Sequence, residues 1–355
     1  MIINALAIVF VFGLLVMIHE FGHYIIARLN GIKVLEFAFG FGPKIVGFRG
    51  KETEYNLRAI PLGGFVRLYG MDPEVNEDGE QILAPSHDPQ SFMNKKVWQR
   101  MAVIAAGAIM NFVLAIFLFV LVFAYYGIPT AANGNAIGSL VEGKPAAQVG
   151  IQTGAKILAI DGVATHDWNT LVNAIHSKPN QKVTLMVEQA GKQETFTLQT
   201  EKDEKTGYGM VGIAPEVIYE KTSLLNSVKY GMERTVEFTR LIVVALVQMI
   251  TGKAPAELGG PVAIAQVIGE GAQQGWASLL SLTGMLSIQL GILNLFPIPA
   301  LDGSRLVFLF VEGLRGKPVK PERENFIHFI GFVLLFALMI AVTYQDIVKL
   351  FVGKG

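Results

Sequence analysis

The sequence predicts a polytopic α-helical membrane protein with four transmembrane helices and an inserted soluble domain of α+β type. The chain of 355 residues is 52% hydrophobic and only 16% charged, whereas soluble domains carry about 25% charged residues. Four segments approach the roughly 20 apolar residues that cross a bilayer. A more polar stretch with strand-like alternation, residues 128–215, separates the second segment from the third.

The predicted spans are 2–18, with apolar character resuming at Tyr24–Ala27, then 102–124, 277–301 and 326–345. The first span lacks the basic start and the small-residue cleavage site of a signal peptide, so we expect it to be retained. Residues 224–253 hold a shorter apolar run, Leu241–Ile250, among interleaved basic residues. This pattern favours an amphipathic helix at the membrane interface; a buried helix of the soluble part is the alternative.

The segments between the spans have their own patterns. Residues 31–70 predict short strands punctuated by glycines, namely Ile32–Phe41, Lys44–Phe48, Glu54–Ala59 and Gly64–Tyr69. Residues 71–96 are polar and predict a loop. Within 128–215 we expect strands at Lys182–Glu188 and Glu194–Gln199 and a helix near Trp168–His176.

The number of crossings and the positions of the basic residues predict the topology. Four spans leave both termini on one side and place the loops 28–96 and 303–325 on the other. Lysine and arginine gather in the 303–325 loop, which predicts that this loop is cytoplasmic. The domain at 128–215 is then extracytoplasmic.

Charge and cysteine content exclude several classes of function. Twenty-nine basic residues balance twenty-nine acidic ones, so no basic excess indicates nucleic-acid binding. The sequence has no cysteine, which excludes disulfides, thiolate metal sites and iron–sulfur clusters. A metal must therefore be held by histidines and carboxylates.

The run His19-Glu20-Phe21-Gly22-His23 fits the pattern H-E-x-x-H. On a helix the two histidines lie about 40° apart and face the same way, as half of a tetrahedral zinc site. Glu20 beside them can take a proton from a metal-activated water, as in metalloproteases. Each ionisable group at a bilayer centre costs about 2.5–3.5 kcal/mol, so such groups are functional by default. There are two alternatives. One is that these side chains snorkel at the end of the segment, near Arg28. The other is that the two histidines ligate haem, which leaves Glu20 unexplained.

A catalytic zinc needs a third protein ligand. The remaining histidines lie in polar loops, in the soluble domain or near a span end, and predict surface or structural roles: His87, His166, His176 and His328. Asp302 and Glu312 are the carboxylates near the third span. Pro297 and Pro299 break the helix before Asp302, and non-helical backbone at membrane depth is tolerated where it lines a cavity or is buried in protein. Asp302 is therefore favoured, although spacing alone does not exclude Glu312.

These motifs together resemble the site-2 protease family of intramembrane zinc metalloproteases, and most closely its bacterial sigma-E-factor regulatory branch. The family's N-x-x-P-x-P-x-L-D-G matches Asn294 to Gly303 without a mismatch. The resemblance implies that His19, His23 and Asp302 hold one Zn²⁺ and that Glu20 is the general base. Two further runs resemble family elements: Gly40-Phe41-Gly42-Pro43 a membrane-associated β-hairpin, and Gly107 to Phe112 a second-span motif that here lacks its proline but keeps Asn111.

The soluble segment resembles a PDZ domain. Lys144-Pro145-Ala146-Ala147 and the run from Gly150 to Gly162 match the bacterial form, with Ala155 in place of the usual aspartate. The resemblance implies a groove in which an extended peptide adds to a sheet edge. Its carboxylate-binding strand would be Tyr208–Ile213, with a purely structural turn as the alternative. The groove residues would be Gly209, Met210, Val211 and Gly212.

The predicted function is proteolysis inside the bilayer of a bacterial cytoplasmic membrane. The resemblance implies single-span substrates, either anti-sigma factors or signal-peptide remnants. Candidate substrate contacts are Asn294, Pro297, Pro299, Asn111 and, on an edge strand at Gly64–Tyr69, Gly64 and Phe65. The predicted domains are 1–127 and 277–355 as the two halves of the protease core, 128–215 as the PDZ domain, and 216–276 as connector and interfacial helix.

Two other functions remain open at this point. One is a metal-binding membrane transporter without proteolytic activity, although the chain lacks the internal repeats typical of transporters. The other is a membrane scaffold built around the PDZ domain, which would not need His19, Glu20 or His23.

Overall fold

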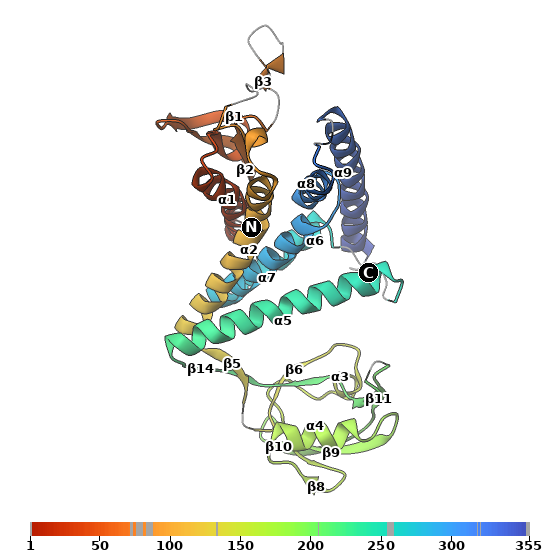
Figure 1. The fold of residues 1–355 in the computed structure, drawn as a ribbon. Helices are drawn as coiled ribbons and strands as arrows, with labels where there is room; N and C mark the ends of the chain where they lie inside the picture. Colours follow the sequence, from red (N-terminus) through yellow and green to blue (C-terminus); the bar gives the residue numbers. More distant parts are fainter. Residues whose placement is uncertain are drawn as a thin grey trace. The chain divides into compact units, whose positions relative to one another are not determined.

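The computed structural model describes residues 2–71, 74–75, 81–82, 88–132, 134–204, 206–253, 259–317, 319 and 321–352. The chain forms two compact units, shown in Figure 1. The helical unit comprises Met1–Phe123 and Ser223–Gly355, and the β-rich unit comprises Ala124–Thr222. His87 and, from the predicted loop 71–96, residues 72–73, 76–80 and 83–86 lie outside the described residues.

Four helices in the described part of the chain are long and apolar enough to cross a membrane: α1 (Ile2–Leu29), α2 (Val97–Tyr125), α7 (Trp276–Leu295) and α9 (Pro321–Val352). They match the four predicted spans. α1 continues without a break through His19 and His23. α7 ends at Leu295, before the predicted end at residue 301, because Pro297 and Pro299 have no N–H to continue the helix.

Three further helices complete this unit: α5 (Leu224–Ile250), α6 (Pro261–Gln274) and α8 (Asp302–Arg315). α8 fills the first half of the connecting segment predicted at 303–325 and ends at Gly316, whose φ is +66°. α5 covers the predicted amphipathic helix. Its Gly231 packs on Val120 of α2, and the rings of Phe238 and Phe119 stack 5.8 Å apart.

A curled sheet follows α1, built from β1 (Val34–Arg49) and β2 (Glu54–Leu68). The four predicted strands run together as these two long, bent strands. The register places four segments side by side, in the order 64–68, 34–39, 54–57 and 46–49. Residues 64–68 therefore form an edge, with no partner strand on their far side in the part of the chain that the structure describes. The short strands β3 (Glu74–Val75) and β4 (Gln81–Ile82) pair beyond it, and a 3₁₀ turn, η1 (Phe92–Asn94), precedes α2.

The β-rich unit has a four-stranded sheet in the order β10 (Lys192–Gln199), β9 (Lys182–Gln189), β7 (Lys156–Ile160) and β8 (Val163–Ala164). Helix α4 (Trp168–His176) begins where Asp167 accepts a hydrogen bond from the N–H of Thr170. These elements match the predicted strands and helix. The remaining elements are short: β5 (Ile128–Ala131), β6 (Ile137–Leu140), α3 (Pro145–Gln148), β11 (Glu201–Lys202), β12 (Gly209–Met210), β13 (Ile213–Pro215) and β14 (Val217–Glu220).

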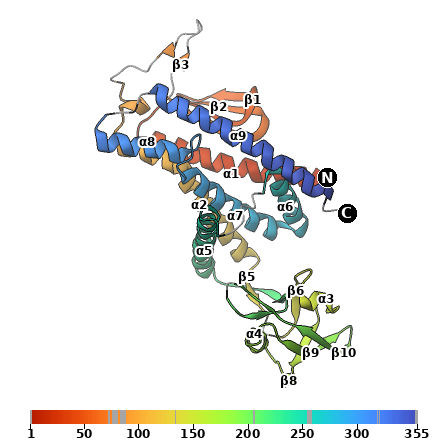
Figure 2. The same cartoon turned by 90° about the vertical axis from the view of Figure 1, so that its right-hand side faces the viewer.

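Each unit buries its own apolar residues. In the β-rich unit, Leu171 and Ile175 of α4 pack against Leu185 and Val187 of β9. In the helical unit, Val11 and Leu15 of α1 pack with Leu114 of α2. The view in Figure 2 follows α1, α8 and α9 along their lengths.

Candidate metal centre

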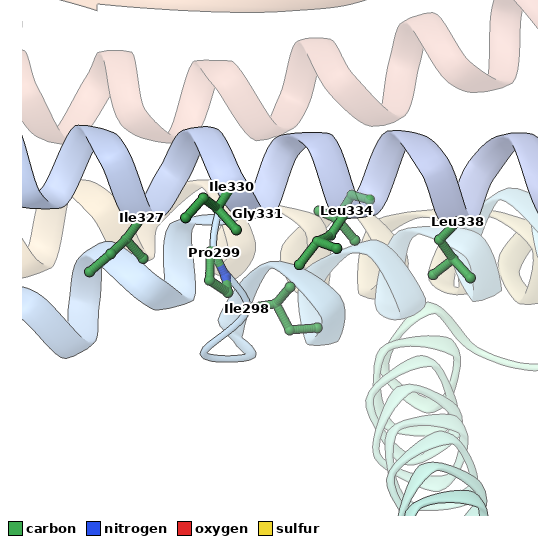
Figure 3. Close-up of a pocket in the computed structure, with 8 residues that line it drawn as sticks. Ile298, Pro299, Ile327, Ile330, Gly331, Leu334 and Leu338 are labelled. Carbon is green, nitrogen blue, oxygen red and sulfur yellow. The ribbon is translucent and has the colours of Figure 1, made fainter.

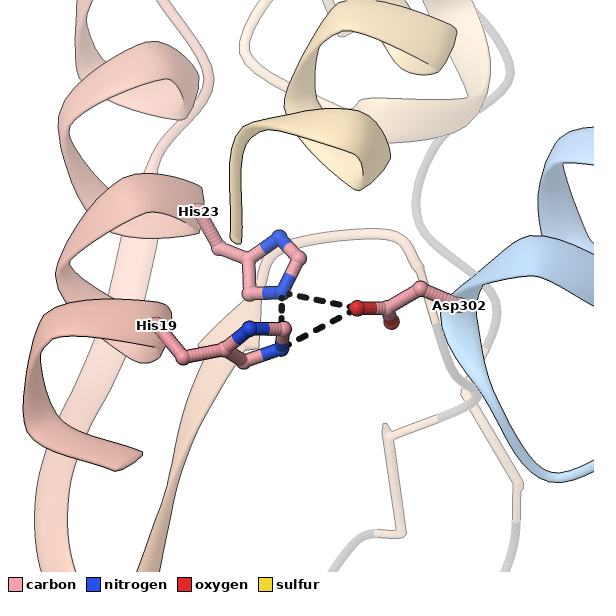
Figure 4. A group of neighbouring side chains, drawn as sticks. All are labelled: His19, His23 and Asp302. Carbon is pink, nitrogen blue, oxygen red and sulfur yellow. Dashed lines mark hydrogen bonds and ion pairs between the residues drawn. The ribbon is translucent and has the colours of Figure 1, made fainter. Parts of the chain in front are cut away.

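Three potential metal ligands from two helices meet at one point of the helical unit. Nε2 of His19 and Nε2 of His23, both on α1, lie 3.1 Å and 3.3 Å from Oδ2 of Asp302 at the start of α8. The two Nε2 atoms are 3.2 Å apart. Figure 4 shows the two imidazoles and the carboxylate pointing toward one another. Among the described residues, this is the one group of three or more histidine and acidic side chains that could share a metal ion.

The spacing of these atoms fits zinc. Donors about 2.0–2.2 Å from a tetrahedral zinc lie roughly 3.3 Å from one another, which is close to the three observed distances. Both histidines are buried, and among the described residues the buried Oδ2 of Asp302 has no hydrogen-bond or ion-pair partner apart from these two imidazoles. Three unprotonated donors this close would repel one another, and a cation between them removes that cost. Three protein ligands also leave the fourth position open, as catalytic zinc sites do.

Hydrogen bonds behind the histidines aim them at this point. Nδ1–H of His23 donates to the carbonyl of Val103 on α2 at 2.8 Å, which leaves its Nε2 free to bind a metal. The side-chain amide of Asn111 lies 3.2 Å from Nδ1 of His19. Asn111 is fully buried, and its backbone carbonyl accepts a hydrogen bond from Ser287 on α7. Three helices thus hold the two imidazoles in place.

Two glycines let α2 approach the histidine pair. A side chain at Gly107 would have its Cβ 2.4 Å from Nε2 of His23 and 2.7 Å from Cε1 of His19. A Cβ at Gly22 of α1 would lie 2.3 Å from the carbonyl oxygen of Ala106. Any larger residue at Gly107 would therefore fill the space beside the ligand atoms.

Glu20 lies between the histidines and the edge strand. The backbone N–H of Val66 in β2 lies near its carboxylate. A Cβ at Gly64 would be 3.5 Å from Cγ of Glu20. The edge strand predicted to hold substrate therefore lies directly beside the predicted general base.

The rival carboxylate, Glu312, is occupied elsewhere. It pairs with the buried guanidinium of Arg100 at the start of α2, where Nη1 lies 3.2 Å from Oε2 and Nη2 makes the second contact. A carboxylate held in this two-pronged pair is not available to the histidines. The geometry favours Asp302, as the sequence does.

The other predicted site residues are more scattered. Asn294 is buried near the end of α7, and Pro297 and Pro299 lie in the loop between α7 and α8. The ring of Phe65 stacks on that of Phe41 and lies under the Arg58 guanidinium. In the β-rich unit, Gly209 and Val211 are buried and Met210 is exposed, while the carbonyls of Val211 and Gly212 accept hydrogen bonds from Ala146 and Val141.

Comparison with known proteins identifies the family. Residues 7–338 match the family described as Peptidase family M50. The chain belongs to peptidase family M50. Zinc metalloprotease RasP of Bacillus licheniformis is 34% identical over 422 residues, covering 98% of this chain and 99% of that protein. Regulator of sigma-W protease RasP of Bacillus subtilis is 33% identical over 420 residues, with coverage of 98% and 99%.

A solved structure is also similar to part of the chain. The PDZ domain of the SdrC-like protein from Listeria monocytogenes is 26% identical over 25% of this chain and 93% of that chain, with a TM-score of 0.22. Membership of family M50 makes the chain a membrane-embedded zinc metalloprotease. The predictions of enzyme class and of zinc as cofactor are thereby confirmed.

The sequence did not predict the roles of three contributors to the site, although Gly107 lies in the second-span motif. Gly107 gives the histidines their space, the Val103 carbonyl orients His23, and His328 contacts the loop before Asp302. A signal existed for one of them, because Gly107 lies four residues before Asn111 and so on the same face of α2. The contacts of Val103 and His328 depend on tertiary packing and have no local pattern.

Proposed function

We propose that this M50 peptidase cuts single-span membrane proteins within their transmembrane segment. His19, His23 and Asp302 hold one zinc ion, and Glu20 is the general base. The observation that carries this proposal is the convergence of three ligand atoms beside Glu20, two of them on α1, a helix long enough to span a bilayer, and the third from Asp302 at the start of α8.

We further propose that α1, α2, α7 and α9 each cross a bacterial cytoplasmic membrane. The segments between α1 and α2 and between α7 and α9 then lie on the cytoplasmic side. Basic residues near α8, including Arg305 and Arg315, support this orientation. The domain at 128–215 is then extracytoplasmic, between the two halves of the protease core at 1–127 and 277–355, and the segment 216–276 reconnects them.

The chemistry divides between the metal and Glu20. The contribution of zinc, when bound, is to polarise the scissile carbonyl and to lower the pKa of an attacking water toward about 7. Glu20 takes the proton from that water and passes it to the leaving amine.

The edge strand at residues 64–68 offers a place for the unwound substrate. A substrate strand added to this edge satisfies its own backbone groups, which is necessary away from water. Gly64 allows close approach to Glu20, and Phe65 supplies an apolar contact. Asn294, Pro297 and Pro299 would contact the substrate from the opposite loop.

For Asn111 we propose a positioning role in place of the predicted substrate contact. It is fully buried against Nδ1 of His19. Its Oδ1 has no hydrogen-bond partner among the described residues while Nδ2 faces the imidazole, and amide oxygen and nitrogen are interchangeable by a flip. With Oδ1 toward His19, the amide accepts Nδ1–H and leaves Nε2 free for the metal.

We propose an anti-sigma factor or a signal-peptide remnant as the substrate class. The name of the Bacillus subtilis relative, regulator of sigma-W protease, supports the first of these. For the β-rich unit we propose a PDZ domain that selects substrates by an exposed terminus. The groove at Gly209, Met210, Val211 and Gly212 stays a prediction, with Met210 the exposed side chain among them.

Cleavage of a defined substrate tests the proposal. The purified full-length protein is incubated in micelles with a synthetic single-span peptide, and the masses of the products are measured by mass spectrometry. We expect a cut inside the span, loss of activity with a zinc chelator, and recovery on adding Zn²⁺. Cleavage that survives the chelator, or that falls only outside the span, would contradict it. A peptide whose span is all leucine serves as a control that resists unwinding.

A further inference from the structure

The position of Asp302 depends on an irregular loop. Residues 296–301 connect the end of α7 to the start of α8 and leave the helical path. Within this loop Ala300 has a φ of +77°. This left-handed conformation is unfavourable for a residue with a Cβ and persists only where the surroundings hold it. Leu301 alone separates Ala300 from Asp302.

Helix α9 holds this loop at two adjacent points. The N–H of Ala300 donates a hydrogen bond to Nδ1 of His328 at 3.1 Å. One turn further along α9, Pro299 packs directly against Gly331. A Cβ at Gly331 would lie 2.3 Å from Cβ of Pro299 and 2.6 Å from its carbonyl oxygen. Figure 3 shows Pro299 pointing at Gly331, on the wall of an apolar cavity of about 320 Å³.

The surroundings of His328 fix how its ring can act. Because Nδ1 accepts the Ala300 N–H, the ring proton of neutral His328 must be on Nε2. Among the described residues, the buried Nε2 has no hydrogen-bond partner, and Oε1 of Glu324 is 3.8 Å away. The edge of the ring meets Phe308 of α8, with centroids 5.9 Å apart. His328 therefore contacts both α8 and the loop that precedes it.

We propose that His328 is a positioning residue for the metal ligand Asp302: by accepting the Ala300 N–H, and with Pro299 seated on Gly331, it fixes the loop that aims the carboxylate at His19 and His23. This inference rests on the proposed ligand role of Asp302. Without the hydrogen bond from Ala300 to His328 and the contact of Pro299 with Gly331, the loop is free to leave its strained conformation. The carboxylate then spends less time within reach of the two Nε2 atoms, and zinc binding weakens.

A pair of substitutions separates the hydrogen bond from the shape of the ring. His328→Phe keeps a ring against Phe308 but has no acceptor. His328→Asn lacks the ring but can place Oδ1 where Nδ1 was. Phe329→Leu, at an exposed neighbour on the same helix, is the matched control. Each full-length protein is titrated with zinc against a competing chelator, and its Co²⁺ form is examined by visible absorption, which reports the number and geometry of the ligands.

We expect His328→Phe to bind zinc about 10- to 100-fold more weakly, as loss of partners that orient ligands does. Its cobalt spectrum should shift toward that of Asp302→Ala, and His328→Asn should recover most of the affinity. Unchanged zinc affinity in His328→Phe would overturn the inference. So would equal losses in the Phe and Asn variants, because the acceptor would then not matter.

If His328→Phe does not fold, a second variant tests the same inference. Gly331→Ala pushes on Pro299 and should also weaken zinc binding, whereas Gly313→Ala on α8 meets only an ordinary contact at 3.6 Å. Wild-type zinc affinity in Gly331→Ala would then overturn the inference. The Asp302→Ala reference separates the two proposals. If it binds zinc normally, the proposed ligand set is wrong; if it loses zinc while the His328 and Gly331 variants do not, only this inference fails.

Discussion

Glu20 and the residues that touch the histidines have different tasks, and single substitutions should separate them. Glu20→Gln removes the proton acceptor but leaves His19, His23 and Asp302 in place. We expect it to retain zinc and to lose at least about 100-fold in cleavage rate, the lower range for general acid–base catalysis. Metal analysis beside the peptide assay checks this. A variant that cleaves at the wild-type rate would refute the assigned role.

Asn111 should act on zinc binding through His19. Asn111→Leu leaves Nδ1 of His19 without a partner, and we expect zinc affinity to fall by about 10- to 100-fold. Asn111→Asp keeps an acceptor for Nδ1–H and should retain most of it. Ile109→Leu, on the exposed side of α2, serves as the control. Equal zinc affinities for all four proteins would rule out the positioning role.

Between elements, the pair Arg100–Glu312 connects the start of α2 to α8 without taking part in metal binding. Glu312→Ala leaves a buried guanidinium unpaired, which costs about 3–5 kcal/mol. We expect a clear loss of thermal stability with zinc content unchanged. Glu237→Ala, which breaks an exposed pair with Arg234 on α5, should cost no more than about 0.5 kcal/mol. If the Glu312→Ala protein folds but loses zinc, Glu312 would again have to be considered as a metal ligand.

The turn after β7 should make the β-rich unit sensitive to acid. Asp161 accepts the N–H of Thr184 at 2.7 Å and pairs with Lys178, and these interactions lower the pKa of its carboxyl group. Because the pKa is lower in the folded state, the stabilisation is present above the ordinary aspartate value of about 3.9 and is lost as the pH falls below it. Urea unfolding of fragment 124–222 at pH 6 and pH 3 should show that Asp161→Asn abolishes this part of the pH dependence. An identical pH dependence in the variant would contradict the assignment.

Local patterns in the sequence predicted much of the site. The residues that hold the metal ligands in position were found only in the folded structure. Two histidines four residues apart require only a helix to face the same way. Asp302 stood out because Pro297 and Pro299 precede it. The segment predicted to connect two spans at 303–325 contains a helix because α8 is amphipathic: its charges, such as Arg305 and Glu312, lower the hydropathy but do not oppose a helix. The contact between His328 and Ala300 joins residues 28 positions apart, and no local pattern marks it.

At the level of the whole molecule, the β-rich unit should select substrates without taking part in the chemistry. Its ends are joined by the β5–β14 ladder, in which Ala131 pairs with Val217. Replacing residues 132–216 by Asn-Gly closes this ladder as a two-residue hairpin. We expect the shortened protein to keep zinc and to cleave a trimmed substrate. We also expect it to accept a substrate with a bulky outer domain that the intact enzyme rejects. If it holds zinc but cleaves no trimmed substrate, the unit does more than select.

The central claim is that His19, His23 and Asp302 together hold a catalytic zinc ion. Zinc X-ray absorption on purified Glu20→Gln protein tests it most directly, because that variant keeps the ligands and does not turn over. We predict nitrogen and oxygen ligands at about 2.0–2.2 Å with the signature of two imidazoles, and loss of zinc or of one ligand when Asp302→Ala is added. A spectrum with fewer than two imidazoles, or one that Asp302→Ala leaves unchanged, would contradict the account.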